Sequence, residues 1–287
     1  MKQIKYFFQF IIIVFLFIIY KILGLKISQV LSSFILKQIG PLFRSKKIIE
    51  TNLSIAFPKL NQIQKNKIIN SMWANYGKIF AEYMFIKKFR ISSKFSNKIT
   101  IENQNELEKI KLQKKPVIFI SGHFNNFELM AMHIEKSGIN LAAIYRPLNN
   151  SFLNPIMEKI RIKYICKKQI KKGLSGTKEI LKYFKKNTSF ALMIDQRVSE
   201  GISCDFFDKK ALTTSIPAQF IKKFNCKVIP VYIERVNKYK FRLEILNPIE
   251  FSQDQNIYSI TFNLNKIIEK MIKKNPEQWI WTHNRWK

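Results

Sequence analysis

Cysteine, glycine and acidic residues are scarce in this sequence. Its three cysteines give neither a paired disulfide framework nor a Cys-x-x-Cys metal motif, which favours a reducing compartment. Its 8 glycines and 9 prolines in 287 residues exclude the fibrous and low-complexity classes. The 47% of hydrophobic residues excludes intrinsic disorder as the main state. The chain is long enough for one large domain with a buried core.

The shortage of acidic residues leaves a strongly basic chain. Fifty lysines and arginines stand against 19 aspartates and glutamates, a net charge of +31. Such an excess indicates an anionic partner, which is a nucleic acid, a membrane surface or an acidic protein. The abundance of lysine, isoleucine and asparagine is also what an AT-rich genome produces. No nucleic-acid recognition motif is present, so we expect no nucleic-acid partner.

One long apolar run lies near the start of the chain. It extends from Tyr6 to Tyr20, and residues 21–25 bring it to about 20 residues, the minimum for a membrane span. A cleavage site with small residues is missing, which argues against a signal peptide. Residues 1–25 are therefore predicted to be an N-terminal transmembrane or membrane-anchor helix, and residues 26–287 a single domain. A buried core helix is the alternative, and full span or interfacial position stays open.

Basic residues are denser after the apolar run than before it. By the positive-inside rule, the domain is expected on the cytoplasmic side of the membrane. Residues 61–86 carry apolar side chains at spacings of three and four, which predicts an amphipathic helix.

From about residue 98, strand and helix patterns alternate. This alternation predicts an α/β fold whose central sheet is mixed, largely parallel and flanked by helices. The expected strands are 99–102, 117–121, 141–145, 190–195, 227–234 and 240–246. The expected helices are 126–137, 151–165, 174–186, 214–224 and 257–274.

The segment after residue 117 carries the candidate chemistry. A buried strand ends at Ser121, Gly122 permits a tight turn, and His123 follows on the loop. Glu128 falls near the first turn of the next helix, with Asn125 or Asn126 as its expected cap. A carboxylate that orients an imidazole suits it for work as a general base, so His123 and Glu128 are the predicted catalytic pair.

Other catalytic motifs are missing or badly spaced. His123, Glu128 and His133 are five residues apart, and five-residue steps on a helix do not bring side chains to one face. No metal site is therefore expected. The sequence has no Gly-x-Ser-x-Gly elbow and no Walker loop, and no cofactor is expected.

The segment Gly122–Glu128 resembles the His-x4-Asp/Glu signature of glycerolipid-type acyltransferases. In detail it resembles the Gly-His-Phe-Gly-Asn-Trp-Glu form of the lipid A late acyltransferases, the lauroyl and myristoyl transferases of Gram-negative bacteria. Asn125 replaces the usual glycine of this segment, and Asp208 stands where the family often has a second glycine. Five further blocks agree in order: 52–58, 145–150, 193–196, 205–218 and 276–287.

The resemblance implies transfer of a fatty acyl chain from acyl carrier protein to a hydroxyl of a lipid A precursor, at the inner membrane. It implies that His123 takes the proton of the acceptor hydroxyl and that Glu128 stabilises the imidazolium. Arg146 would supply positive charge to an oxyanion or a lipid phosphate, and Asp195 would hold Arg146 or a sugar hydroxyl. The residues expected to bind substrate are Arg146, Asn149, Asn150, Asp195 and Gln196.

Two other functions compete with this one. A phospholipid acyltransferase of the lysophosphatidic acid type shares the His-x4-acid chemistry, but its Phe-Pro-Glu-Gly-Thr-Arg-like phosphate motif is missing here. A basic, membrane-tethered binding protein without enzymatic activity is the other alternative.

Overall fold

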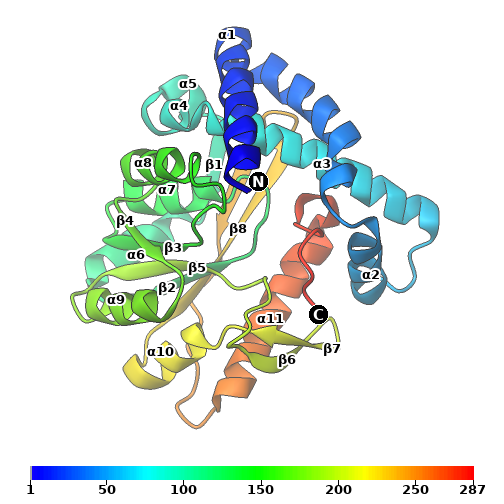
Figure 1. The fold of residues 1–287 in the computed structure, drawn as a ribbon. Coiled ribbons are helices and arrows are strands. Elements are labelled where there is room, and N and C mark those ends of the chain that lie inside the picture. The colour runs from blue at the N-terminus through cyan, green and yellow to red at the C-terminus, as the bar shows by residue number, and fades with distance from the viewer. Residues whose placement is uncertain (1) are drawn as a thin grey trace.

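A seven-stranded mixed sheet forms the centre of residues 2–287, the part of the chain that the computed structural model describes, with Leu174 described by its backbone alone (Figure 1). The strand order is β1-β9-β8-β2-β5-β3-β4. All pairs are parallel except β8 with β9. The predicted α/β class with a largely parallel sheet is therefore confirmed. The strands of this sheet are β1 (Ile99–Glu102), β2 (Ile118–Ser121), β3 (Leu141–Tyr145), β4 (Lys168–Lys171), β5 (Ser189–Met193), β8 (Val228–Asn237) and β9 (Lys240–Ile245).

Helices flank this sheet on both faces. The chain moves outward from β2 to β3 and β4 and then returns to β5, so right-handed crossovers place α7 and α8 on one face and α9 on the other. The helices of the sheet domain are α6 (Gln104–Gln113), α7 (Glu128–Lys136), α8 (Asn154–Tyr164), α9 (Leu174–Phe184), α10 (Ile216–Phe224) and α11 (Ile257–Lys274).

A hairpin of β6 (Ile202–Phe206) and β7 (Lys209–Thr213) stands apart from the main sheet. Its turn residues Phe207 and Asp208 both have positive φ, of 52° and 56°. The positive φ explains why glycine is common at this position in the family that the chain resembles. Aspartate tolerates the left-handed region better than most other residues do. The sequence patterns predicted neither this hairpin nor β4 and α6.

Residues 2–96 form a helical layer, visible in blue and cyan in Figure 1. Its elements are α1 (Lys2–Phe43), α2 (Lys46–Ala56), α3 (Gln62–Tyr83), α4 (Ile86–Ile91) and α5 (Ser93–Ser96). The predicted helix at 61–86 is confirmed as α3, which begins with a capping box from Asn61 and Gln64. A Cβ on Gly77 would lie 2.3 Å from the carbonyl oxygen of Ser32, so glycine permits the close packing of α1 on α3.

The predicted boundary at residue 25 falls within α1. This helix contains a break at Gly24, whose φ of 75° and ψ of 168° are not helical. Leu25, just past the break, is buried. Within the described residues, α1 is the helix long and apolar enough to cross a membrane.

Candidate active site

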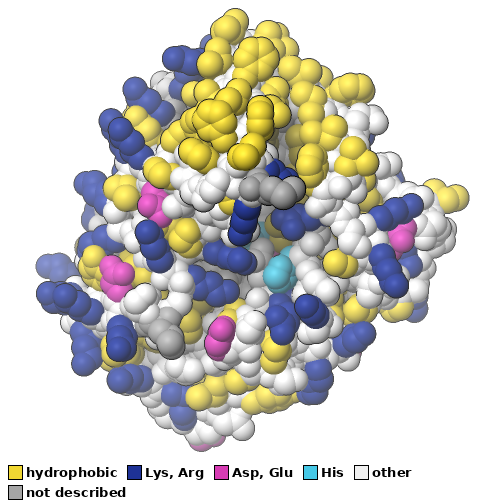
Figure 2. Space-filling model, viewed as in Figure 1, with side chains coloured by type: hydrophobic (Ala, Val, Ile, Leu, Met, Phe, Trp, Pro, Cys, Tyr) yellow, Lys and Arg dark blue, Asp and Glu magenta, His cyan; other side chains and the backbone are white. Residues whose placement is uncertain are grey.

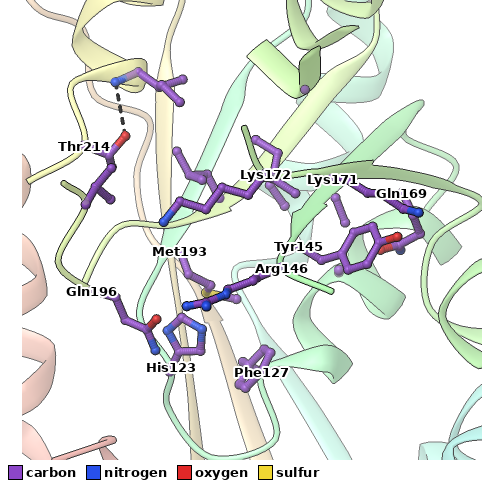
Figure 3. A pocket seen from close by; sticks show the side chains of 18 of the residues that line it. His123, Phe127, Tyr145, Arg146, Gln169, Lys171, Lys172, Met193, Gln196 and Thr214 are labelled. Carbon is purple, nitrogen blue, oxygen red and sulfur yellow. Dashed lines mark hydrogen bonds between the residues drawn. The ribbon is translucent and has the colours of Figure 1, made fainter. Parts of the chain in front are cut away.

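Three strand ends place the central side chains of the site. Parallel strands β2, β5 and β3 are neighbours, so their carboxyl ends meet at one edge of the sheet. His123 follows β2, Arg146 follows β3, and Asp195 and Gln196 follow β5. Ligands of open α/β sheets bind outside this edge. Figure 3 shows His123, Arg146 and Gln196 directed into one cavity of about 220 Å³.

The imidazole of His123 pairs with Asp195. The Nδ1 atom of His123 lies 2.8 Å from Oδ1 of Asp195, and its backbone N–H donates to Oδ2 at 2.8 Å. The predicted pairing of His123 with Glu128 is replaced by this contact, because Asp195 arrives at the neighbouring strand end from 72 residues away. When the Nδ1–H group donates its hydrogen bond to Asp195, Nε2 carries the free lone pair of the imidazole, which is the arrangement that a general base requires.

Asp195 is fully buried and ionised in this arrangement. Burial alone would raise the pKa of its carboxyl, but the charge and hydrogen bonds of His123, with the Trp279 indole, hold the pKa below its usual value. The Trp279 Nε1–H donates to Oδ2 at 2.7 Å. Within the described residues, the hydrogen bonds of the Asp195 carboxylate are to His123 and Trp279, whereas the sequence suggested a contact with Arg146 or a sugar hydroxyl.

Glu128 lies in the same cavity wall but has other partners. Its Oε1 accepts hydrogen bonds from Nε and Nη2 of Arg161, at 2.9 and 2.6 Å, and from the Tyr83 hydroxyl at 2.9 Å. Burial lowers the pKa of Arg161, but Glu128 outweighs it and raises the pKa above its ordinary value. The Nη1 group of Arg161 is buried and has no hydrogen-bond partner within the described residues. Glu128 thus holds in place a guanidinium whose Nη1 group is free to donate a hydrogen bond.

Arg146 and Gln196 line the cavity, as the sequence predicted for residues that meet substrate. Arg146 is exposed at the rim. Lys172 lines the same cavity, and its pKa is lowered by burial and by the charge of Arg146. This end of the cavity is therefore cationic.

Asn149 and Asn150 lie outside the cavity lining. Asn149 is exposed, whereas Asn150 is buried. The Nδ2 group of Asn150 donates to the carbonyl oxygen of Tyr6 at 2.9 Å, and its Oδ1 accepts from the backbone N–H of Phe152 and Leu153. In the structure, Asn150 fastens α1 to the β3–α8 connection, a role that the sequence did not suggest.

Asn125 and Asn126 anchor the loop that carries His123. Neither caps α7, whose N-cap residue is Phe127. Asn125 has a φ of 46°, a conformation that suits the glycine usual at that position in the family that the chain resembles. Its side-chain amide donates a hydrogen bond to Oε1 of Gln278. Asn126 is buried and donates to Glu82 at 2.9 Å. The loop is thus tied to α3 and to the C-terminal segment.

The sequence reasoning assigned no role in the site to Tyr83, Arg161 or Trp279. Trp279 lies in the C-terminal block, which is the signal that could have suggested it. His283 from the same block also lines the cavity, where its Nε2 accepts from the backbone N–H of Arg197 at 2.9 Å. Burial lowers the pKa of His283 to about 4. His133 is a buried residue of α7 and does not line the cavity.

Comparison with known proteins identifies the family. The family model described as bacterial lipid A biosynthesis acyltransferase matches residues 1–287. The chain is 24% identical to the lipid A biosynthesis palmitoleoyltransferase of Escherichia coli (strain K12) over 85% of this chain and 79% of that protein. It is 23% identical to the lauroyltransferase of that strain, with the same coverage, and 19% identical to its myristoyltransferase, over 85% of this chain and 75% of that protein. The chain therefore belongs to the bacterial lipid A biosynthesis acyltransferase family, as its motifs indicated.

Proposed function

We propose that this protein transfers a fatty acyl chain from acyl carrier protein to a hydroxyl of a lipid A precursor, at the cytoplasmic side of the inner membrane. The observation that carries the proposal is the His123–Asp195 pair at the wall of the cavity, with Nδ1 and Oδ1 2.8 Å apart. The family and its curated relatives support lipid A as the acceptor.

His123 is the general base in this mechanism. Its Nε2 takes the proton of the acceptor hydroxyl while the oxygen attacks the thioester carbonyl carbon. The carbon–sulfur bond then breaks, and the imidazolium returns the proton to the leaving thiolate. Asp195 stabilises the imidazolium and fixes its tautomer, as a buried carboxylate does in other acyl-transfer sites. The donor brings its own activated acyl group, so the chemistry requires no metal or other cofactor.

Positive charge stabilises the tetrahedral oxyanion. The free Nη1–H of Arg161 is the donor that we assign to this role, and Glu128 is the positioning residue that keeps the guanidinium in the cavity wall. Arg146 and Lys172 at the rim meet an anionic part of a substrate, either a phosphate of the acceptor or of the carrier prosthetic group. Gln196 supplies a hydrogen bond there.

The basic surface fits the acidic carrier protein. Figure 2 shows lysine and arginine side chains around a histidine near the middle of the visible face, and Arg146, Arg161, Lys171, Lys172 and Arg197 line the cavity. Such a surface speeds the encounter with an acidic partner.

The variant His123→Ala tests the mechanism. We expect a loss of about 10²–10⁴-fold in turnover with unchanged thermal unfolding, because a general base typically contributes that much. The assay uses purified protein, acyl carrier protein charged with a fatty acid and a tetraacylated lipid A precursor, with product measured by mass spectrometry.

His133→Ala serves as the matched control, since His133 lies outside the cavity. Corrected for its folded fraction, this variant keeps its turnover. Activity of His123→Ala within a few-fold of the unmodified protein would exclude His123 as the base. Acylation of lysophosphatidic acid in place of the lipid A precursor would favour the phospholipid acyltransferase.

A further inference from the structure

The long apolar helix α1 consists of two arms that meet at Gly24. Residues 2–23 form the first arm and residues 25–43 the second. Gly24 adopts φ 75°, a conformation that only glycine takes at little cost. Figure 1 shows the two arms meeting at an apex at the top of the view, with the start of the first arm close to the sheet domain.

The first arm is fastened to the rest of the protein near both of its ends. Near its start, Asn150 donates to the carbonyl oxygen of Tyr6 at 2.9 Å. Near its end, the ring centroids of Phe17 and Phe80 are 5.1 Å apart, and Tyr20 is fully buried. From Tyr6 to Tyr20 the helix rises about 21 Å at 1.5 Å per residue. A first arm that crossed a bilayer would have to abandon one of these two sets of contacts.

The outward surface of both arms is apolar. The side chains that it exposes are Ile4, Phe7, Phe8, Ile11, Ile12, Phe15, Ile18, Ile22, Ile27, Val30, Phe34, Ile39, Leu42 and Phe43. Figure 2 shows hydrophobic side chains gathered over this part of the molecule. An apolar surface of this extent is not left in water by a soluble protein.

The charges of α1 fit an anionic lipid surface. The helix contains no acidic residue, and four of its five lysines occur at the ends of the first arm or beside the break: Lys2, Lys5, Lys21 and Lys26. The fifth, Lys37, lies within the second arm. In a helix that lies in the plane of a membrane, such lysines reach the headgroups while the apolar face enters the acyl region. If both arms instead entered the membrane as a perpendicular hairpin with the break foremost, Lys21 and Lys26 would be deepest in the hydrocarbon.

We propose that α1 is a monotopic anchor that lies in one leaflet of the membrane, so that its first residues stay on the same side as the active-site cavity. This differs from the single-pass anchor expected from the sequence. The inference concerns the mode of membrane attachment and holds whichever lipid the enzyme acylates, so its test does not depend on activity.

Cysteine labelling in membranes gives the first test. Lys2→Cys and Lys287→Cys, expressed singly in a Gram-negative host, are treated with a membrane-impermeant maleimide in spheroplasts and in inverted inner-membrane vesicles. The unmodified chain, with Cys166 and Cys204 buried and Cys226 partly buried, is the blank. We expect both variants to be labelled in the same preparation. Labelling of Lys2→Cys and Lys287→Cys in opposite preparations would overturn the proposal.

Disulfide trapping tests the docked first arm directly. The Ser151 hydroxyl donates to Oε1 of Gln3 at 2.9 Å, so the double variant Gln3→Cys with Ser151→Cys brings two thiols together. We expect a cross-linked peptide on mild oxidation of native membranes, identified by mass spectrometry after proteolysis. Each single variant is the control and should give none. Failure of the double variant to cross-link, while folded and membrane-bound, would show that the first arm leaves the domain.

Discussion

Three donors converge on the carboxylate of Asp195: the imidazole of His123, the backbone N–H of His123 and the indole of Trp279. A buried carboxylate with these partners fixes both the position and the tautomer of the imidazole. At the scale of the residue, the proposed mechanism therefore depends on a contact between two strand ends that lie far apart in the sequence.

Asp195→Asn should lower turnover by about 10²–10⁴-fold, although the side chain keeps its shape. An amide can present N–H to Nδ1 and so favour the tautomer protonated on Nε2, which cannot accept a proton. Asp208→Asn, at the exposed turn between β6 and β7, is the matched control. Steady-state kinetics of both variants decide the matter, and equal turnover in the two would show that the His123–Asp195 contact has no catalytic part.

Acid sensitivity follows from His133. Burial, with smaller contributions from Lys136 and Arg90, lowers its pKa to about 4. The imidazole of His133 binds a proton at a higher pH in the unfolded protein than in the folded one. The free energy of unfolding is therefore fully retained above about pH 6.5 and falls as the pH drops toward 4. The loss reaches on the order of 3 kcal/mol below pH 4. His133→Gln should lessen the pH dependence of thermal unfolding between pH 7 and 4.5, and His283, whose pKa is also lowered to about 4, accounts for a similar remainder. The same slope in the variant and the unmodified protein would assign the acid sensitivity to other groups.

At the scale of the element, α1 is built into the fold rather than appended to it. Its first arm carries a fully buried tyrosine, and its second arm packs closely on α3. Gln29 of the second arm donates a hydrogen bond to Glu82, which also accepts from Asn126 in the loop after β2. A connected set of buried polar groups thus joins the membrane helix to the loop that carries His123.

Two substitutions in the first arm should separate packing from membrane binding. Tyr20→Ala should destabilise the protein in detergent by about 3–5 kcal/mol, the usual cost of removing a large buried side chain. Ile18→Ala, in an exposed position, should leave unfolding unchanged and weaken binding to vesicles that contain anionic lipid. Denaturant unfolding and vesicle co-sedimentation measure the two effects. Loss of stability in both variants would contradict this division of the helix.

The elements with strong periodicity were predictable from the sequence. The six expected strands and the helix at 61–86 are present, because long apolar repeats report burial directly. Strand β4 escaped, since Lys168, Gln169 and Lys171 give it a polar pattern. The motifs identified His123, Arg146 and Gln196, which the structure places in one cavity. Local spacing did not indicate that Asp195 pairs with the imidazole or that Arg161 pairs with Glu128. Those pairings depend on which strands and helices become neighbours.

At the scale of the whole molecule, the charge distribution fits the acidic carrier protein that we propose as the donor. The net charge is +31, and basic side chains line the cavity and surround a histidine on the visible face (Figure 2). Attraction of this kind acts over about 10 Å at 0.1 M salt and shrinks as the salt concentration rises.

Salt should therefore discriminate between donors. Raising the ionic strength from about 50 mM to 500 mM should lower kcat/KM for acyl carrier protein by tenfold or more, through slower association. A small uncharged acyl thioester, which lacks the acidic protein, should lose little under the same conditions. Parallel kinetic assays with both donors provide the comparison. An equal response to salt would indicate that the basic surface does not recruit the carrier.

The docking of the first arm beside the β3–α8 connection has a kinetic consequence. Asn150, which holds that arm, is four residues beyond Arg146 at the cavity rim. If α1 lies along a leaflet as proposed, this connection places the cavity rim near the lipid surface, and a lipid acceptor would reach it by lateral diffusion. Encounter with the acceptor then becomes a two-dimensional search. Its rate scales with the mole fraction of that lipid in the leaflet, so inert phospholipid acts as a diluent even when the total amount of acceptor is held constant.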